Sequence, residues 1–69
     1  MPNETPDTIM HELSGAYGTS GINWSYALFP NKATAETFDE RCNNAGYRTR
    51  NLHQTQIGEY AVQFHHYQD

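Results

Sequence analysis

Apolar and polar residues follow two different periods along the second two-thirds of the chain. Ile22–Phe29 is an aromatic segment whose alternating residues are typical of a strand. Asn31–Ala45 has apolar residues at helical spacing and is followed by Gly46, which favours a helix end. Tyr47–His53 and Glu59–Tyr67 are extended segments separated by a polar turn, which indicates a strand pair. The order of these elements is strand, helix, strand, strand.

The same pattern predicts which faces are buried. The first strand has a face of large apolar residues that we expect to pack in the core: Ile22, Trp24, Tyr26 and Leu28. The helix has one narrow apolar stripe: Ala35, Phe38, Cys42 and Ala45. The last strand has one face with Tyr60, Val62 and Phe64. Since Phe38 is the only large residue of the helical stripe, the helix should depend on it.

A short helix is also predicted near the N-terminus. Thr5 suits the N-cap position, Pro6 suits the first helical position, and Gly15 would end the helix. Residues 15–21 contain three glycines and are expected to form a flexible loop. Residues 1–21 are therefore predicted to be the mobile part of the protein.

These elements predict a single small α+β domain over residues 1–69, with a βαββ core at residues 22–67 and a three-stranded antiparallel sheet. This order, together with Phe38 and Gly46-Tyr47, resembles half of a ferredoxin-like fold. The same order occurs in SPOR-like peptidoglycan-binding domains and in RNA-recognition modules. The aromatic signatures of the RNA-recognition family are absent, so the resemblance implies an architecture and no functional residues.

Composition indicates a thin core. Among 69 residues only ten are Leu, Ile, Val or Phe, while five Tyr and one Trp supply large amphipathic surfaces. A core of this kind is expected to be completed by a partner or by a second copy, most simply in a symmetric homodimer. The single cysteine cannot form an internal disulfide, and no apolar segment is long enough for a membrane span. With no targeting segment at the N-terminus, we expect a cytoplasmic protein.

The candidate chemistry does not favour an enzyme, a metal or a cofactor. His65 and His66 are neighbours in a strand, so their rings point to opposite faces and cannot readily hold one ion. Cys42 could be a nucleophile, but its place on the apolar stripe favours a buried thiol. The acidic residues are dispersed, and no pair suggests acid–base catalysis.

Two kinds of binding remain, and both involve the predicted strand pair. Arginine and aromatic residues on a sheet can hold single-stranded nucleic acid. However, the chain has eight acidic and four basic residues, a net charge of −4, which opposes phosphate binding. We therefore expect a protein partner, for example a host protein inhibited by a phage-encoded modulator, or a larger assembly with this chain as a small subunit. The candidate partner-binding residues are Tyr47, Arg48, Arg50, His65 and Tyr67.

Overall fold

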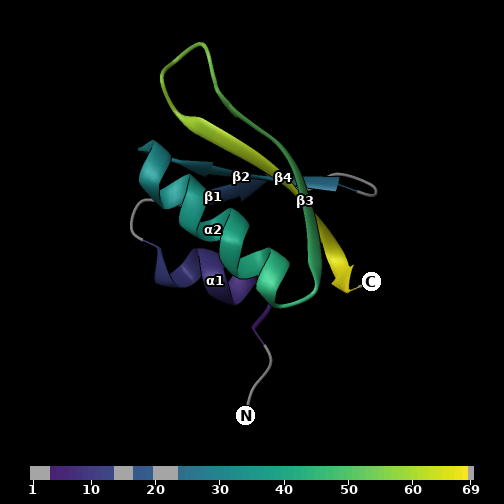
Figure 1. Ribbon diagram of the computed structural model, residues 1–69. Helices are drawn as coiled ribbons and strands as arrows, with labels where there is room; N and C mark the ends of the chain where they lie inside the picture. Colours follow the sequence, from purple (N-terminus) through teal and green to yellow (C-terminus); the bar gives the residue numbers. More distant parts are fainter. Residues whose placement is uncertain (1–3, 14–16, 20–23, 69) are drawn as a thin grey trace.

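The computed structural model describes residues 4–13, 17–19 and 24–68, without the side chains of Tyr17, Thr19 and residues 66–68. Its elements, in chain order, are α1 (Pro6–Glu12), β1 (Tyr17–Thr19), β2 (Trp24–Phe29), α2 (Lys32–Asn44), β3 (Tyr47–Gln54) and β4 (Tyr60–Gln68), as shown in Figure 1. The α+β class and the order of a short N-terminal helix followed by βαββ are confirmed. The two described helices lack the length and apolarity needed to cross a membrane.

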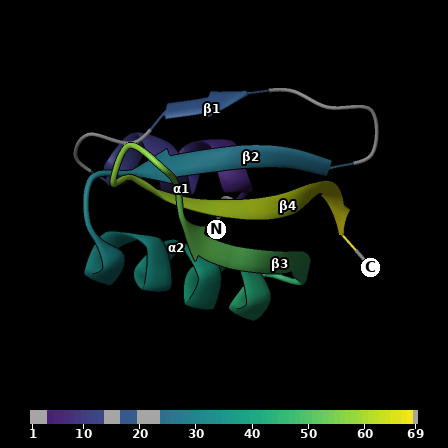
Figure 2. The same ribbon diagram turned by 90° about the horizontal axis from the view of Figure 1, so that it is seen from above.

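The strands form one antiparallel sheet in the order β1-β2-β4-β3, which Figure 2 shows side by side. The last strand of the chain is thus a central strand, paired with both β2 and β3. Across β2 and β4, Ala27 lies opposite Val62 and Ser25 lies opposite Phe64. Across β4 and β3, Gln63 lies opposite Arg50.

The short strand β1 was not predicted, because its segment was interpreted as a flexible loop. Gly18 pairs with Ala27 of β2, so the chain forms a fourth strand at the sheet edge. The glycine also permits a close approach: a Cβ atom at this position would lie 3.3 Å from the Met10 Sδ atom and 3.1 Å from the Tyr26 carbonyl oxygen. Glycine here indicates packing of α1 over the strand.

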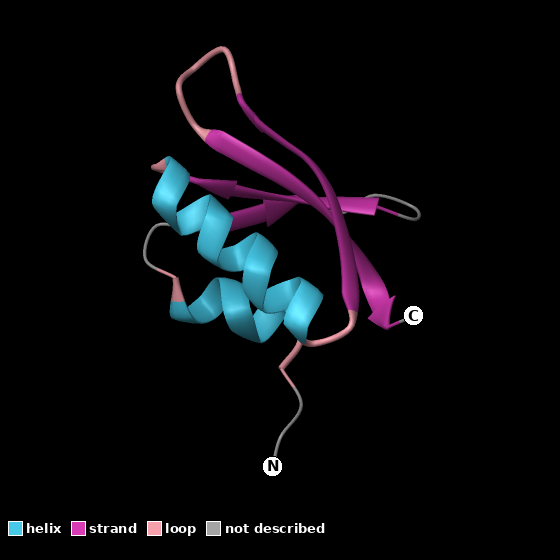
Figure 3. Ribbon diagram, in the orientation of Figure 1, coloured by secondary structure: helices cyan, strands magenta, loops and turns pink. Residues whose placement is uncertain are grey.

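Both helices lie on one side of the sheet (Figure 3). Ile9 of α1 and Phe38 of α2 are fully buried, and they join Phe29, Val62 and Phe64 of the strands in the core. The Phe38 ring centre lies 5.1 Å from that of Phe29 and 5.4 Å from that of Phe64. The helical stripe is as predicted, since Ala35 and Cys42 are also fully buried.

The predicted packed face of β2 is wrong. Ser25, Ala27 and Phe29 are buried beneath the helices, whereas Tyr26 is 38% exposed on the other face. Small residues at positions 25 and 27 give room for the helices, and Phe29 contacts Phe38 directly. Ile22, which belonged to the same prediction, lies outside the described residues.

The ends of the helices follow the sequence closely. The Asn31 Oδ1 atom accepts a hydrogen bond of 2.8 Å from the Thr34 backbone N–H, and Gly46 after α2 has a φ of 91°. Thr5 and Thr8 form a reciprocal capping box at α1, which ends at Glu12, before the predicted Gly15.

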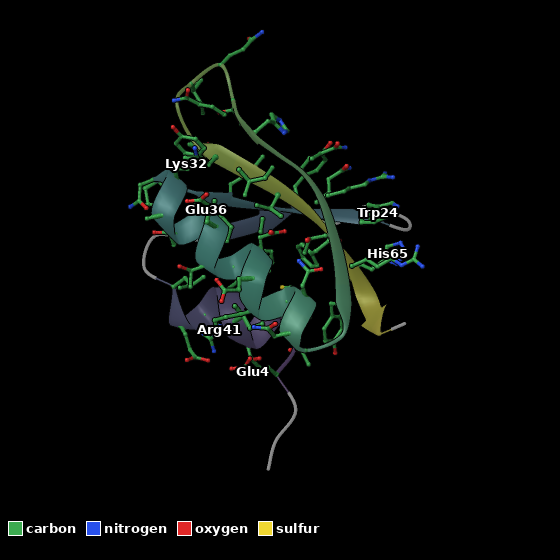
Figure 4. The ribbon with its side chains drawn as sticks, in the orientation of Figure 1. Glu4, Trp24, Lys32, Glu36, Arg41 and His65 are labelled. Carbon is green, nitrogen blue, oxygen red and sulfur yellow. The ribbon has the colours of Figure 1, made fainter. Side chains whose placement is uncertain are left out.

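Ion pairs connect the two helices. The Arg41 guanidinium donates to Glu4 at 2.5 Å and to Glu12 at 3.1 Å, and Figure 4 shows Arg41 and Glu4 next to one another. With the burial of Ile9, these contacts dock α1 on the rest of the domain. The predicted mobility of residues 1–21 stays a prediction, because residues 1–3, 14–16 and 20–23 lie outside the described ranges.

Candidate functional site

The sheet has a second face, opposite α1 and α2, which we call the open face. Side chains alternate along a strand, so the residues between the core positions point to this face. Within the described part of the chain, no helix lies on it. The residues of the open face are Trp24, Tyr26 and Leu28 of β2, Ala61, Gln63 and His65 of β4, and Arg50 of β3.

An aromatic and cationic cluster occupies one end of the open face. Trp24 and His65 lie opposite each other in register, and their ring centres are 4.0 Å apart. The Arg50 Cζ atom lies 3.8 Å from the centre of the Trp24 ring, which is a cation–π contact. Figure 4 shows Trp24 and His65 together, at the end of the sheet away from Lys32. We call Trp24, Arg50 and His65 the Trp–Arg–His cluster.

A hydrogen bond to Gln63 holds the Arg50 side chain of this cluster in place. The Gln63 Oε1 atom accepts hydrogen bonds from Arg50 Nε at 3.0 Å and from Asn51 Nδ2 at 2.7 Å. Two consecutive residues reach one acceptor because Asn51 has a φ of 55°, beside a register shift in β3 that re-aims its side chain. Gln63 is only 8% exposed, so the bonds also satisfy a buried amide oxygen. Arg50 is therefore held in one orientation.

The charges of the protein are separated between the two layers. None of the four strands contains Asp or Glu, while Arg48 and Arg50 lie in β3. Most acidic residues lie in the helices or next to them: Glu4, Asp7, Glu12, Glu36, Asp39 and Glu40. Glu59 directly precedes β4. Most of the negative charge behind the net charge of −4 thus lies in the helical layer and not on the open face.

The structure distributes the five predicted partner-binding residues unequally. Arg50 and His65 come together in the Trp–Arg–His cluster, and Arg48 is exposed on β3. Tyr47, which was predicted to bind a partner, is instead 7% exposed and packs in the core. Its position follows from the register shift between residues 47 and 49, and the side chain of Tyr67 lies outside the described residues.

Sequence reasoning missed five residues of the open face, among them Trp24, Tyr26 and Gln63. Trp24 and Tyr26 were assigned to the core because they are larger than Ser25 and Ala27 on the opposite face. The alternation along β2 gives one face of small residues and one aromatic face. Because two helices pack on the face of small residues, the aromatic face is left outside the core. For Gln63 the sequence has no signal, because its partners are set by the fold.

Cys42 has no place in this site. It is fully buried on α2, and burial, with a smaller effect from Asp39, raises the pKa of its thiol to about 12. The thiol is therefore protonated at neutral pH and is a poor nucleophile. Among the described residues, no three His, Cys, Asp or Glu side chains lie where they could hold a metal ion.

We expect the Cys42 thiol to react with a thiol reagent only when the domain opens. In the native protein at pH 8, labelling with an aromatic disulfide reagent should be at least about a hundredfold slower than in urea, because the thiol is both protonated and covered. The absorbance of the aromatic thiolate that the reagent releases measures the labelling rate in both solvents. Equal rates in the two solvents would show that Cys42 is accessible and would contradict its place in the core.

Comparison with known proteins finds no matching protein family, no matching curated protein and no matching solved structure. Function is therefore inferred from the open face alone.

Proposed function

We propose that this chain is a small non-enzymatic protein-binding module that holds a protein partner on its open face. The observation that carries the proposal is the Trp–Arg–His cluster on a sheet face that no described helix covers. Tryptophan, tyrosine and arginine are the residue types that most often anchor protein interfaces, and Tyr26 lies on the same face. A host protein bound by a phage-encoded inhibitor, or a neighbouring subunit in a cytoplasmic assembly, would be such a partner.

The cluster is organised before binding, and this favours recognition. Arg50 is held by the Trp24 ring and by the Gln63 oxygen, so little side-chain entropy remains to be lost on association. Gln63 and Ala61 of the open face are buried, in contrast to the larger side chains around them. A second copy of this chain is one further possible occupant, and homodimerisation stays a prediction.

Single-stranded nucleic acid is the second candidate ligand, and the separation of charge favours it. Because the strands lack carboxylates, the electrostatic objection drawn from the net charge is weaker at the open face. Two observations still favour a protein. Arg48 and Arg50 are the only Lys or Arg residues in the strands, which is few for phosphate binding, and the Trp24 ring already contacts Arg50 and His65.

Replacing both strand arginines distinguishes these functions. We expect Arg48→Ala with Arg50→Ala to retain the fold and to weaken association with the protein partner roughly thirtyfold, or about 2 kcal/mol. The partner is first captured from extract on the wild-type chain and identified by mass spectrometry, and affinities are then measured by calorimetry. Lys32→Ala, which removes a positive charge from the helical layer, serves as the control and should leave the affinity unchanged.

Titration with a labelled oligothymidylate tests the nucleic-acid alternative. The proposal predicts no change in its fluorescence anisotropy with the wild-type chain, even at low salt, because two arginines neutralise too few phosphates. Tight binding that the double substitution abolishes and salt weakens would make the open face a nucleic-acid surface.

A further inference from the structure

Arg50 is fixed by the protein but is not saturated by it. The Cζ atom of its guanidinium lies 3.8 Å from the centre of the Trp24 ring, and its Nε atom donates to Gln63 Oε1 at 3.0 Å. None of the described residues accepts a hydrogen bond from its two terminal nitrogens, Nη1 and Nη2. An immobilised guanidinium with open terminal donors suits a planar anion, because carboxylates accept paired N–H bonds from arginine.

The surroundings of Arg50 also favour an anion. Its cross-strand neighbour is the amide of Gln63, its guanidinium contacts the Trp24 ring, and no strand contains a carboxylate that would compete for the guanidinium. His65, whose ring centre lies 4.0 Å from that of Trp24, has an imidazole as a further polar group. Glu36, Asp39 and Glu40 lie on α2 and repel an acidic partner, whereas the open face presents the Arg50 guanidinium.

We propose that Arg50 binds a carboxylate of the protein partner, supplied by an Asp or Glu of a segment that lies across β2, β4 and β3. This inference rests on the proposed function and specifies the chemistry of the partner. A carboxylate is favoured over the phosphates of a nucleic acid because the face offers one fixed guanidinium, which suits a single anion, and lacks a row of cations. The rings beside Arg50 then exclude water from the ion pair and pack against the neighbouring side chains of the partner segment.

Two capped octapeptides test the carboxylate directly. One alternates Glu with Thr, and the other alternates Gln with Thr, so that they differ in charge and match closely in shape. Trp24 is the only tryptophan of the chain, so its fluorescence reports occupation of the site. The N–H signal of Arg50 Nε in an NMR titration reports on the guanidinium itself. We expect the Glu peptide to bind at least about tenfold more tightly than the Gln peptide and to shift both signals.

Three variants separate geometry from charge. Arg50→Gln should abolish the difference between the two peptides. Arg50→Lys keeps the charge but loses the planar stack on Trp24 and the paired donors, and should remove most of the difference. Lys32→Gln removes one positive charge from α2 and should leave the difference intact. Circular dichroism verifies that each variant is folded.

The outcomes that overturn the inference are distinct from those that overturn the proposed function. Equal binding of the two peptides, or no binding of either, contradicts a carboxylate site. If the captured partner nevertheless loses affinity on Trp24→Ala, the open face still binds protein by other contacts. An oligothymidylate that binds more tightly than the Glu peptide, and in competition with it, would replace the carboxylate by phosphate.

Discussion

Phe38→Ala should leave the domain largely unfolded at room temperature. Phe38 is fully buried and its ring contacts Phe29 and Phe64, so it joins α2 to both central strands. Truncation of a buried phenylalanine costs about 3–5 kcal/mol. A core of this size rarely supplies more than about 3–5 kcal/mol in total. The loss is therefore comparable to the whole free energy of unfolding, and thermal denaturation followed by circular dichroism should show little or no cooperative transition.

Thr37→Ala is the matched control on the same helix. Thr37 is exposed, and its hydroxyl donates only to the Ala33 carbonyl of its own helix. We expect this substitution to change the free energy of unfolding by less than about 0.5 kcal/mol. A Phe38→Ala protein with the melting temperature of the wild type would show that α2 does not pack through Phe38.

Trp24→Ala should have the largest effect on partner binding. The indole is the surface on which Arg50 stacks and His65 packs, so its removal disorders the other two members of the cluster as well. Truncation of a central tryptophan at an interface commonly costs about 2–4 kcal/mol, which is roughly a thirtyfold to thousandfold loss of affinity. We expect about a hundredfold. The fold should survive, because Trp24 lies outside the core formed by Phe29, Phe38 and Phe64.

The helix α2 is the element that the sequence predicts best. Its apolar spacing, its cap at Asn31 and its end before Gly46 are local features, and all three agree with the structure. Local signals also predict the order βαββ. These features depend on residues within a few positions of one another, and they need no knowledge of the tertiary packing.

The open face, in contrast, depends on packing between distant segments. Both faces of β2 contain apolar residues, and only the approach of the helices buries Ser25 and Ala27 and leaves Trp24 and Tyr26 outside. Strand β1 likewise depends on pairing with β2, and a Cβ atom at Gly18 would lie 3.3 Å from the Met10 Sδ atom of α1. Arg50 and His65 were recognised as candidates by residue type, but their meeting with Trp24 requires the strand order β2-β4-β3. In this order β4, which contains His65, lies between the strands of Trp24 and Arg50.

Calorimetric titration of the captured partner tests most directly whether a protein partner occupies the open face. The partner is titrated into the wild-type chain, into Trp24→Ala on the open face, and into Thr37→Ala on the helical layer. We expect about a hundredfold weaker binding for Trp24→Ala, from the loss of a central aromatic anchor, with Thr37→Ala equal to the wild type. Unchanged affinity in a folded Trp24→Ala protein would contradict binding of the partner on the open face.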